Sequence, residues 1–245
     1  MQKFFSFNRN LINKINNLFP FLRSHETYGA DLDNMIKNFI KKSNPSVVIE
    51  FGGIDRPLLS KNCSYTYIGV DIEEKTSCHN IYDKFIVKSI EDDFSLKADL
   101  AISKTLLEHV ENNKKAINSV YNSLNNMGYT IHYVPSKFHP YSLILRLVGP
   151  KFQKIIIHYL RRPAKDVTGY PAFFNHCSCS KMYKIFKDIG FSNISVKPYY
   201  HATDYFAFFL PLYYSVLVFE KLVKYLGIHL FASGFIISAE KINDL

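Results

Sequence analysis

Two carboxylates close neighbouring predicted strands, and acids in that position can accept hydrogen bonds from a ligand. The first strand, VVIE, ends in Glu50 and runs into Gly52 and Gly53 before any helical period begins. The next strand, YTYIGVDI, carries Asp71 near its end. A turn that holds a dinucleotide would read G-x-G-x-x-G and direct helix amides at a pyrophosphate. Here an acid stands where the strand ends, so the loop is not of that kind and the acid needs another explanation.

The elements that would position these acids alternate between strands and helices. Apolar periodicity and the Gly, Pro and Ser punctuation predict strands at 47–50, 65–72, 84–89, 98–103, 129–136, 193–201 and 233–241, and helices at 31–42, 104–128 and 178–191. Gly128 and Gly190 are expected to end the last two helices. Strands separated by helices call for a parallel sheet wound by right-handed crossovers, with ligands at the carboxyl edge of the strands.

The order of these segments resembles a known family. VVIEFGG, YIGVDI, ADLAISKTLLEHV, GYTIHYVPS, DIGFSNISV and FIISAEK follow one another as in class I S-adenosylmethionine-dependent methyltransferases. The resemblance covers about residues 28–242 and lies closest to small methyltransferases with a Leu-Glu-His-Val helix start, similar to those of polysaccharide and antigen biosynthesis clusters. It implies an α/β fold: a Rossmann-like, doubly wound seven-stranded sheet whose antiparallel last strand lies between the fifth and sixth. It also implies an enzyme whose cofactor is S-adenosyl-L-methionine.

This cofactor explains the acids, because it carries a sulfonium, an α-ammonium group and a ribose diol but no phosphate. The resemblance implies that Glu50 accepts hydrogen bonds near the methionine end and that Asp71 takes both ribose hydroxyls. Gly52 would let the backbone approach the ligand without a Cβ in the way. The other cofactor-binding residues that the resemblance implies are Gly53, Ile72, Ile90, Glu91, Ser103 and Lys104.

The glycine loop departs from the family pattern. Ile54 and Arg56 stand where the second and third glycines belong, and Gly53 and Asp55 are the residues that could compensate. The larger side chains would narrow the pocket, and Arg56 would repel a cationic cofactor unless it turns outward. A degenerate descendant that no longer binds the cofactor therefore stays open as an alternative.

The methyl acceptor is expected near the loop that follows the fifth predicted strand. His139, in PSKFHPYS, is the candidate catalytic base, because O-methylation removes a hydroxyl proton and an imidazole titrates near neutral pH. Tyr170 and His176 are candidate substrate-binding residues, with loop packing as the alternative for each. Lysines and arginines between 151 and 162 favour an acceptor with phosphate or carboxylate, such as a small molecule or saccharide linked to a lipid or a nucleotide.

No metal site is expected. Glu108 and His109 resemble the Glu-x-x-Glu-His metal site of some methyltransferases, but Thr105 replaces the first glutamate. The His and Cys residues at 176–179 have no matching pair elsewhere in the chain, which argues against a zinc site.

Two parts of the chain are additions to the expected core. Residues 1–27 predict a basic amphipathic helix that either caps one face of the core or lies on a membrane surface. Residues 28–245 would form the methyltransferase domain, with an acceptor-side insert at 136–175 and an aromatic helical insert at 202–232. The apolar run of the second insert is too short to span a bilayer. It is expected to form a lid over the acceptor, a homodimer face or a contact with lipid.

Charge and cysteine content bear on partners and location. The net charge of +9 and the pI near 9.2 indicate an acidic partner. Nucleic acid is not expected, because no Asn-Pro-Pro-Tyr type motif follows the fourth strand and no basic stripe alternates with aromatics. Four cysteines without framework spacing, and no signal-peptide pattern, predict a cytoplasmic protein, with peripheral membrane contact left open. Two further classes stay open: a non-catalytic methyltransferase-like protein at a membrane surface, and a nucleotide-cofactor oxidoreductase.

Overall fold

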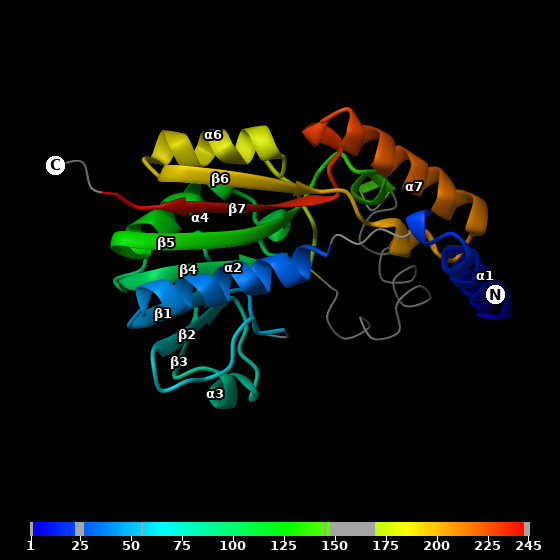
Figure 1. Cartoon of the computed structure of the whole chain (residues 1–245). Helices are drawn as coiled ribbons and strands as arrows, with labels where there is room; N and C mark the ends of the chain where they lie inside the picture. The colour runs from blue at the N-terminus through cyan, green and yellow to red at the C-terminus, as the bar shows by residue number, and fades with distance from the viewer. Residues whose placement is uncertain (1, 23–26, 55, 145, 148–169, 243–245) are drawn as a thin grey trace. The chain divides into compact units, whose positions relative to one another are not determined.

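The computed structural model describes residues 2–22, 27–54, 56–144, 146–147 and 170–242 (Figure 1). The chain divides into two compact units, each assembled from three separate stretches of sequence. Unit 1 comprises Met1–Thr27, Ser136–Ala172 and Pro198–Gly234, and unit 2 comprises Tyr28–Pro135, Phe173–Lys197 and Phe235–Leu245. The N-terminal segment and most of both predicted inserts therefore belong to unit 1, and the predicted sheet belongs almost entirely to unit 2.

Unit 2 is built on a seven-stranded sheet in the order β3-β2-β1-β4-β5-β7-β6. Its strands are β1 (Val47–Phe51), β2 (Thr66–Asp71), β3 (Lys84–Val87), β4 (Ala98–Lys104), β5 (Leu124–Pro135), β6 (Ser192–Tyr199) and β7 (Gly234–Glu240). The first five strands pair in parallel. The last strand runs antiparallel between β5 and β6, which confirms the predicted topology (Figure 1).

The central strands are mostly apolar, as expected for strands whose two faces are both buried. β1 and β4 are closed to solvent over almost every residue, and β2 opens only at its two ends. The helices that cover the sheet are α2 (Tyr28–Ser43), α3 (Cys78–Ile81), α4 (Asn113–Ser123) and α6 (Cys179–Ile189). α2 packs on β5 through the stacked rings of Phe39 and Tyr129, whose centroids are 5.0 Å apart. α4 packs against α6.

The predicted helix at 104–128 is wrong at both ends. Thr105 has a positive φ of 52°, and a short 3₁₀ turn, η2 (Leu107–His109), precedes α4. The helix proper begins after Asn112, whose side chain accepts a hydrogen bond from the Lys115 amide at 3.1 Å. Gly128 does not cap it, because the chain is already extended in β5, where the Gly128 carbonyl accepts from the Lys241 amide at 2.8 Å. Long-range strand pairing has thus overridden local helical periodicity.

Unit 1 is helical. It contains α1 (Gln2–Leu18), η1 (Pro20–Leu22), η4 (Thr203–Phe206), α7 (Leu210–Tyr225) and η5 (His229–Phe231). α1 packs on α7 through a cluster of Ile12, Tyr213 and Leu217. In the part of the chain that the structure describes, no helix combines the length and apolar content needed to cross a bilayer.

Candidate active site

The register of the sheet brings the predicted cofactor residues to one edge of unit 2. Phe51, the last residue of β1, lies beside Ser103 of β4. Asp71 is the last residue of β2, and Lys104 is the last residue of β4. Neighbouring strands lie about 4.8 Å apart, so these strand ends line a short stretch of the carboxyl edge. This is the edge at which open α/β sheets bind their ligands.

The glycines after β1 are required by close packing. Gly52 has a positive φ of 76°, and a Cβ there would lie 2.9 Å from Cδ1 of Leu106. A Cβ on Gly53 would lie 2.2 Å from the hydroxyl of Tyr82 and 2.4 Å from Cδ of Glu50. Only glycine fits at either position; Gly52 is partly exposed at the end of the strand, whereas Gly53 is buried.

Glu50 lies beneath this loop and is almost completely buried, with 1% of its surface exposed. Its carboxylate accepts hydrogen bonds from the hydroxyls of Tyr67 and Tyr82 and from the backbone amide of Leu58, which lies 3.1 Å from both oxygens. Burial raises the pKa of Glu50 to about 7, against the opposing effect of these hydrogen bonds. These contacts are those of a residue that holds the loop in shape. Neither tyrosine partner was predicted from the sequence.

Asp71, Ile72 and Glu91 are cofactor candidates that reach solvent. Asp71 is partly exposed, and its Oδ1 accepts a hydrogen bond from the Glu73 amide at 3.4 Å. Ile72 is more than half exposed, whereas Ile90 is buried. Glu91 is partly exposed, and its carboxylate accepts a hydrogen bond from a backbone amide at the start of α4.

The end of β4 presents one buried and one accessible group. Ser103 is fully buried, and its Oγ lies 2.7 Å from Nδ1 of His132, whose pKa burial lowers to about 3. Lys104 is partly exposed, and its ammonium lies 5.7 Å from the centre of the Tyr28 ring. That ring stacks on Tyr133 with centroids 3.6 Å apart. An aromatic pair therefore lies beside Lys104 at the edge of the sheet.

The two residues that depart from the glycine pattern differ in burial. Ile54 is buried, with 5% of its surface exposed, so its side chain fills protein interior. Arg56 is exposed, so its charge can be solvated away from a cationic ligand. Asp55 lies outside the described residues.

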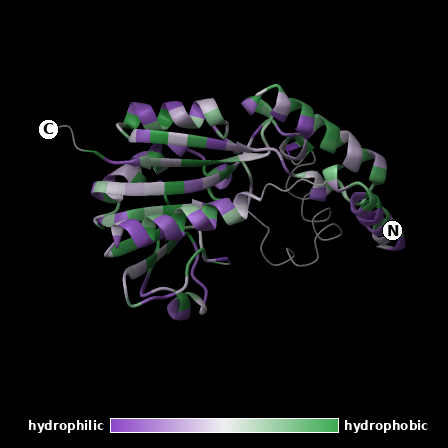
Figure 2. Cartoon of the chain, viewed as in Figure 1, coloured by the Kyte–Doolittle hydropathy of each residue, from purple (hydrophilic) through white to green (hydrophobic). Residues whose placement is uncertain are grey.

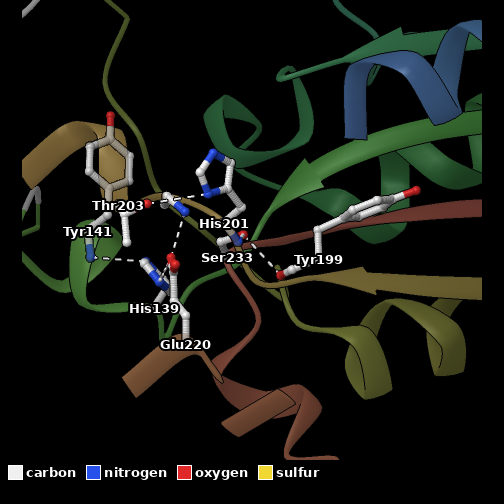
Figure 3. Close-up of polar contacts among 8 residues, drawn as sticks. His139, Tyr141, Tyr199, His201, Thr203, Glu220 and Ser233 are labelled. Atoms are coloured by element: carbon white, nitrogen blue, oxygen red, sulfur yellow. Dashed lines mark hydrogen bonds and ion pairs between the residues drawn. The ribbon is translucent and has the colours of Figure 1, made fainter. Parts of the chain in front are cut away.

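His139 lies in unit 1, fully buried, in a network of hydrogen bonds (Figure 3). Its Nε2 is 3.1 Å from Oε1 of Glu220 on α7, and its Nδ1 accepts a hydrogen bond from the Tyr141 amide at 3.2 Å. The same Glu220 oxygen accepts from the Ala202 amide at 2.6 Å. Both ring nitrogens are engaged, so a role as a base requires Nδ1 to leave the Tyr141 amide.

A second imidazole, missed in the sequence, belongs to His201, the residue before Ala202 in the chain. His201 is partly exposed; its Nδ1 lies 3.3 Å from Oγ1 of Thr203, and its Nε2 lies 3.7 Å from Oδ2 of Asp204 (Figure 3). The His201 amide donates to Ser233 Oγ, which in turn donates to the Tyr199 carbonyl. The only signal in the sequence was a histidine at the end of the sixth predicted strand, in YYHATD.

The comparisons with known proteins agree with the strand-end geometry. A family model described as a methyltransferase domain matches residues 22–196. The chain belongs to this family. No curated protein matches the chain.

Solved structures resemble the methyltransferase domain at low sequence identity. A SAM-dependent methyltransferase from Archaeoglobus fulgidus has a TM-score of 0.54 and 14% identity, over 87% of this chain and 94% of that chain. A possible histamine N-methyltransferase from Thermotoga maritima has a TM-score of 0.50 and 13% identity, over 97% and 99%. A phosphoethanolamine N-methyltransferase from Haemonchus contortus, bound to S-adenosylhomocysteine, has a TM-score of 0.51 and 13% identity, over 87% and 53%. At such identities the likeness establishes the fold.

The remaining candidates of the methyltransferase domain are placed one by one. Tyr170 is partly exposed in unit 1, and His176 is exposed in unit 2 with a positive φ of 61°. Within the described residues, no group of three or more His, Cys, Asp or Glu side chains could hold a metal ion. Glu108 is buried, its Oε1 lies 3.7 Å from Nε2 of His109, and burial raises its pKa to about 8.

Proposed function

We propose that this methyltransferase domain transfers the methyl group of S-adenosyl-L-methionine to a hydroxyl of a small-molecule or glycan-type acceptor. The observation that carries the proposal is the carboxyl edge of β1, β2 and β4. There, a loop that admits only glycine at positions 52 and 53 lies between the partly exposed carboxylate of Asp71 and the end of β4. The site offers acceptors and exposed backbone, which suits a cationic cofactor that has a ribose and no phosphate.

The residues of this edge fit that cofactor. Asp71 accepts hydrogen bonds from the two ribose hydroxyls, and the Gly52 backbone lies against the methionine portion. Glu50, buried beneath the loop, holds the loop in this conformation through Leu58 and two tyrosines. The residues that complete the cofactor site are Ile72, Ile90, Glu91, Ser103 and Lys104. When bound, the cofactor supplies a methyl group that its sulfonium already activates for displacement.

The chain itself must then position the acceptor and, for a hydroxyl, remove its proton. His139 is the proposed base, because a carboxylate 3.1 Å from its Nε2 fixes the orientation of the imidazole, as a buried acid does in catalytic triads. Tyr170, His176 and α7 are each proposed to contact the acceptor. The basic residues of the insert favour an acceptor that carries a phosphate or carboxylate, such as a lipid-linked or nucleotide-linked sugar.

A non-catalytic methyltransferase-like protein is the second candidate. It is favoured by Ile54, whose buried side chain occupies the position of the second glycine in the family pattern. Calorimetric titration with S-adenosyl-L-methionine separates the two. Saturable binding that Asp71→Ala weakens, and that Glu73→Ala two residues away leaves unchanged, supports the enzyme. Failure of the unaltered protein to bind would support the degenerate descendant.

The acceptor is tested with methyl-labelled cofactor and three acceptor panels: free sugars, nucleotide-linked sugars and lipid-linked sugars. Mass spectrometry of the product distinguishes a methyl ether from an N-methyl or C-methyl group. Label transfer to amines or carbon acids with none to hydroxyls would replace O-methylation while leaving methyl transfer intact.

A further inference from the structure

The positive charge of this protein is confined to one of its two units. The sequence of unit 1 contains thirteen Lys and Arg residues against four Asp and Glu residues, and that of unit 2 contains seventeen of each. The whole net charge of +9 therefore belongs to unit 1, and unit 2 is neutral. The cofactor edge lies in unit 2, so the charge asymmetry does not serve cofactor binding, and the charge is available to an anionic partner of unit 1.

α1 of unit 1 has two different faces. Its inward stripe is largely polar: Asn8, Ile12 and Asn16, four residues apart, are all buried. The side chain of Asn8 accepts from the Leu210 amide at 3.0 Å, and that of Asn16 donates to the hydroxyl of Tyr213 at 3.0 Å. These bonds fix the rotation of α1 against α7.

The outward stripe of α1 is apolar. Phe4, Phe7 and Leu18, spaced by three and eleven residues, lie on one helical side and are 51%, 65% and 74% exposed. Lys14, between Phe7 and Leu18, adds an exposed ammonium to the same side. A helix that only capped a core would bury its large apolar side chains, whereas α1 leaves Phe4, Phe7 and Leu18 exposed while it buries Asn8 and Asn16.

α7 carries a second exposed apolar stripe in the same unit. Val218, Leu222, Tyr225 and Leu226 lie one and two turns apart, and each is more than half exposed. Figure 2 shows the long apolar stretches of α7. Exposed Lys221 and Lys224 lie within the stripe, and the one carboxylate of α7, Glu220, is buried against His139.

From these observations we infer that unit 1 docks on an anionic lipid surface. Apolar stripes bordered by ammonium groups and free of exposed acids match an interface of acyl chains and anionic headgroups. Neither helix crosses the bilayer; both lie against its surface. A nucleic acid would match the charge and could stack on Phe4, Phe7 and Tyr225. It would leave the aliphatic side chains of Leu18, Val218, Leu222 and Leu226 in water, whereas acyl chains would cover them. The inference does not depend on the proposed methyl transfer.

Co-sedimentation of the full-length protein with vesicles tests this inference. One set of vesicles is phosphatidylcholine alone, and the other contains about one third phosphatidylglycerol. The protein is expected to sediment with the anionic vesicles, less with the neutral ones, and less at higher salt. Equal binding to both sets, or no binding to either, overturns the inference.

Two kinds of variant separate the apolar and the electrostatic parts. Lys14→Ala should weaken vesicle binding by about fivefold, the effect of one basic residue near an anionic surface. Phe7→Ala with Leu18→Ala should weaken it by roughly tenfold or more. The matched control is Val87→Ala with Met127→Ala, which shortens two equally exposed apolar residues of unit 2 and should change nothing. Circular dichroism checks that each variant is folded.

Two results would assign the surface to another occupant. If duplex DNA displaces the protein from vesicles and the apolar variants bind both equally well, the surface binds nucleic acid. If the Phe7 and Leu18 variant becomes monomeric in sedimentation velocity while its vesicle binding is unchanged, the stripe is a face between copies of this chain. Either result overturns lipid docking.

Discussion

His139 and Glu220 form a buried pair within unit 1, although 81 residues separate them in the sequence. Nε2 of the imidazole lies 3.1 Å from Oε1 of the carboxylate, and the exposed fractions of the two side chains are 0% and 1%. The carboxylate also accepts a hydrogen bond from the Ala202 amide. Glu220 of α7 is therefore bonded both to the loop after β5 and to the segment that precedes η4. The pair fixes the inner structure of unit 1, whatever its part in the reaction.

The first prediction concerns this pair. Glu220→Ala should destabilise the protein by about 3 to 5 kcal/mol, because it leaves a buried imidazole without its partner. Denaturant unfolding measures the loss.

His139→Ala should lower turnover by about 10²- to 10⁴-fold while cofactor affinity stays the same, if the imidazole removes the acceptor proton. Full turnover in a folded His139→Ala variant would leave the residue with a structural role alone.

The second prediction concerns Asp71. Asp71→Ala should weaken binding of S-adenosyl-L-methionine by about 1.5 to 3 kcal/mol, the usual range for hydrogen bonds to a charged group. Calorimetry measures the change, and Glu73→Ala is the control because that acid is exposed close by in the same turn. Unchanged affinity in the Asp71 variant would remove the end of β2 from the cofactor site.

The third prediction concerns the glycine loop. Gly53→Ala should both destabilise the protein and weaken cofactor binding, because its Cβ would overlap the Tyr82 hydroxyl and the Glu50 carboxyl group. Gly29→Ala is the matched control: Gly29 lies in α2 with nothing within 4 Å of the added Cβ, and alanine there should be neutral or stabilising. Thermal unfolding and calorimetry report the two effects. Two variants of equal stability would mean that the loop tolerates a side chain.

The fourth prediction concerns pH. The pKa of Glu50 is raised to about 7 and that of Glu108 to about 8, both from 4.5, so the folded state holds these protons more tightly than the unfolded state. The stability they contribute is complete at and below pH 4.5 and is lost as pH rises through 7 and 8. Glutamine does not titrate, so Glu108→Gln should remove the part of this pH-dependent loss of stability that Glu108 causes, on the order of 4 kcal/mol above pH 8. Unfolding free energies between pH 5 and about pH 9 check this; parallel profiles for the variant and the parent would contradict it.

The sequence by itself determined the sheet and the acids at its edge. β-branched runs separated by helical periods placed the strands, with Glu50 and Asp71 near the ends of the first two. The position of the antiparallel last strand came from the family resemblance. The strand positions are local features, because each depends on the period of a short segment and on the residue that ends it.

Tertiary structure decided what each residue of the site touches. The helix predicted through Gly128 ends at Ser123, because β5 gains backbone hydrogen bonds from Lys241 near the other end of the chain. Glu50 turned out to be held beneath the loop by Tyr67 and Tyr82. His139 pairs with Glu220, and α1 buries Asn8 and Asn16. Burial, and the hydrogen bonds that buried polar groups require, arise from segments distant in sequence, so periodicity could not reveal them.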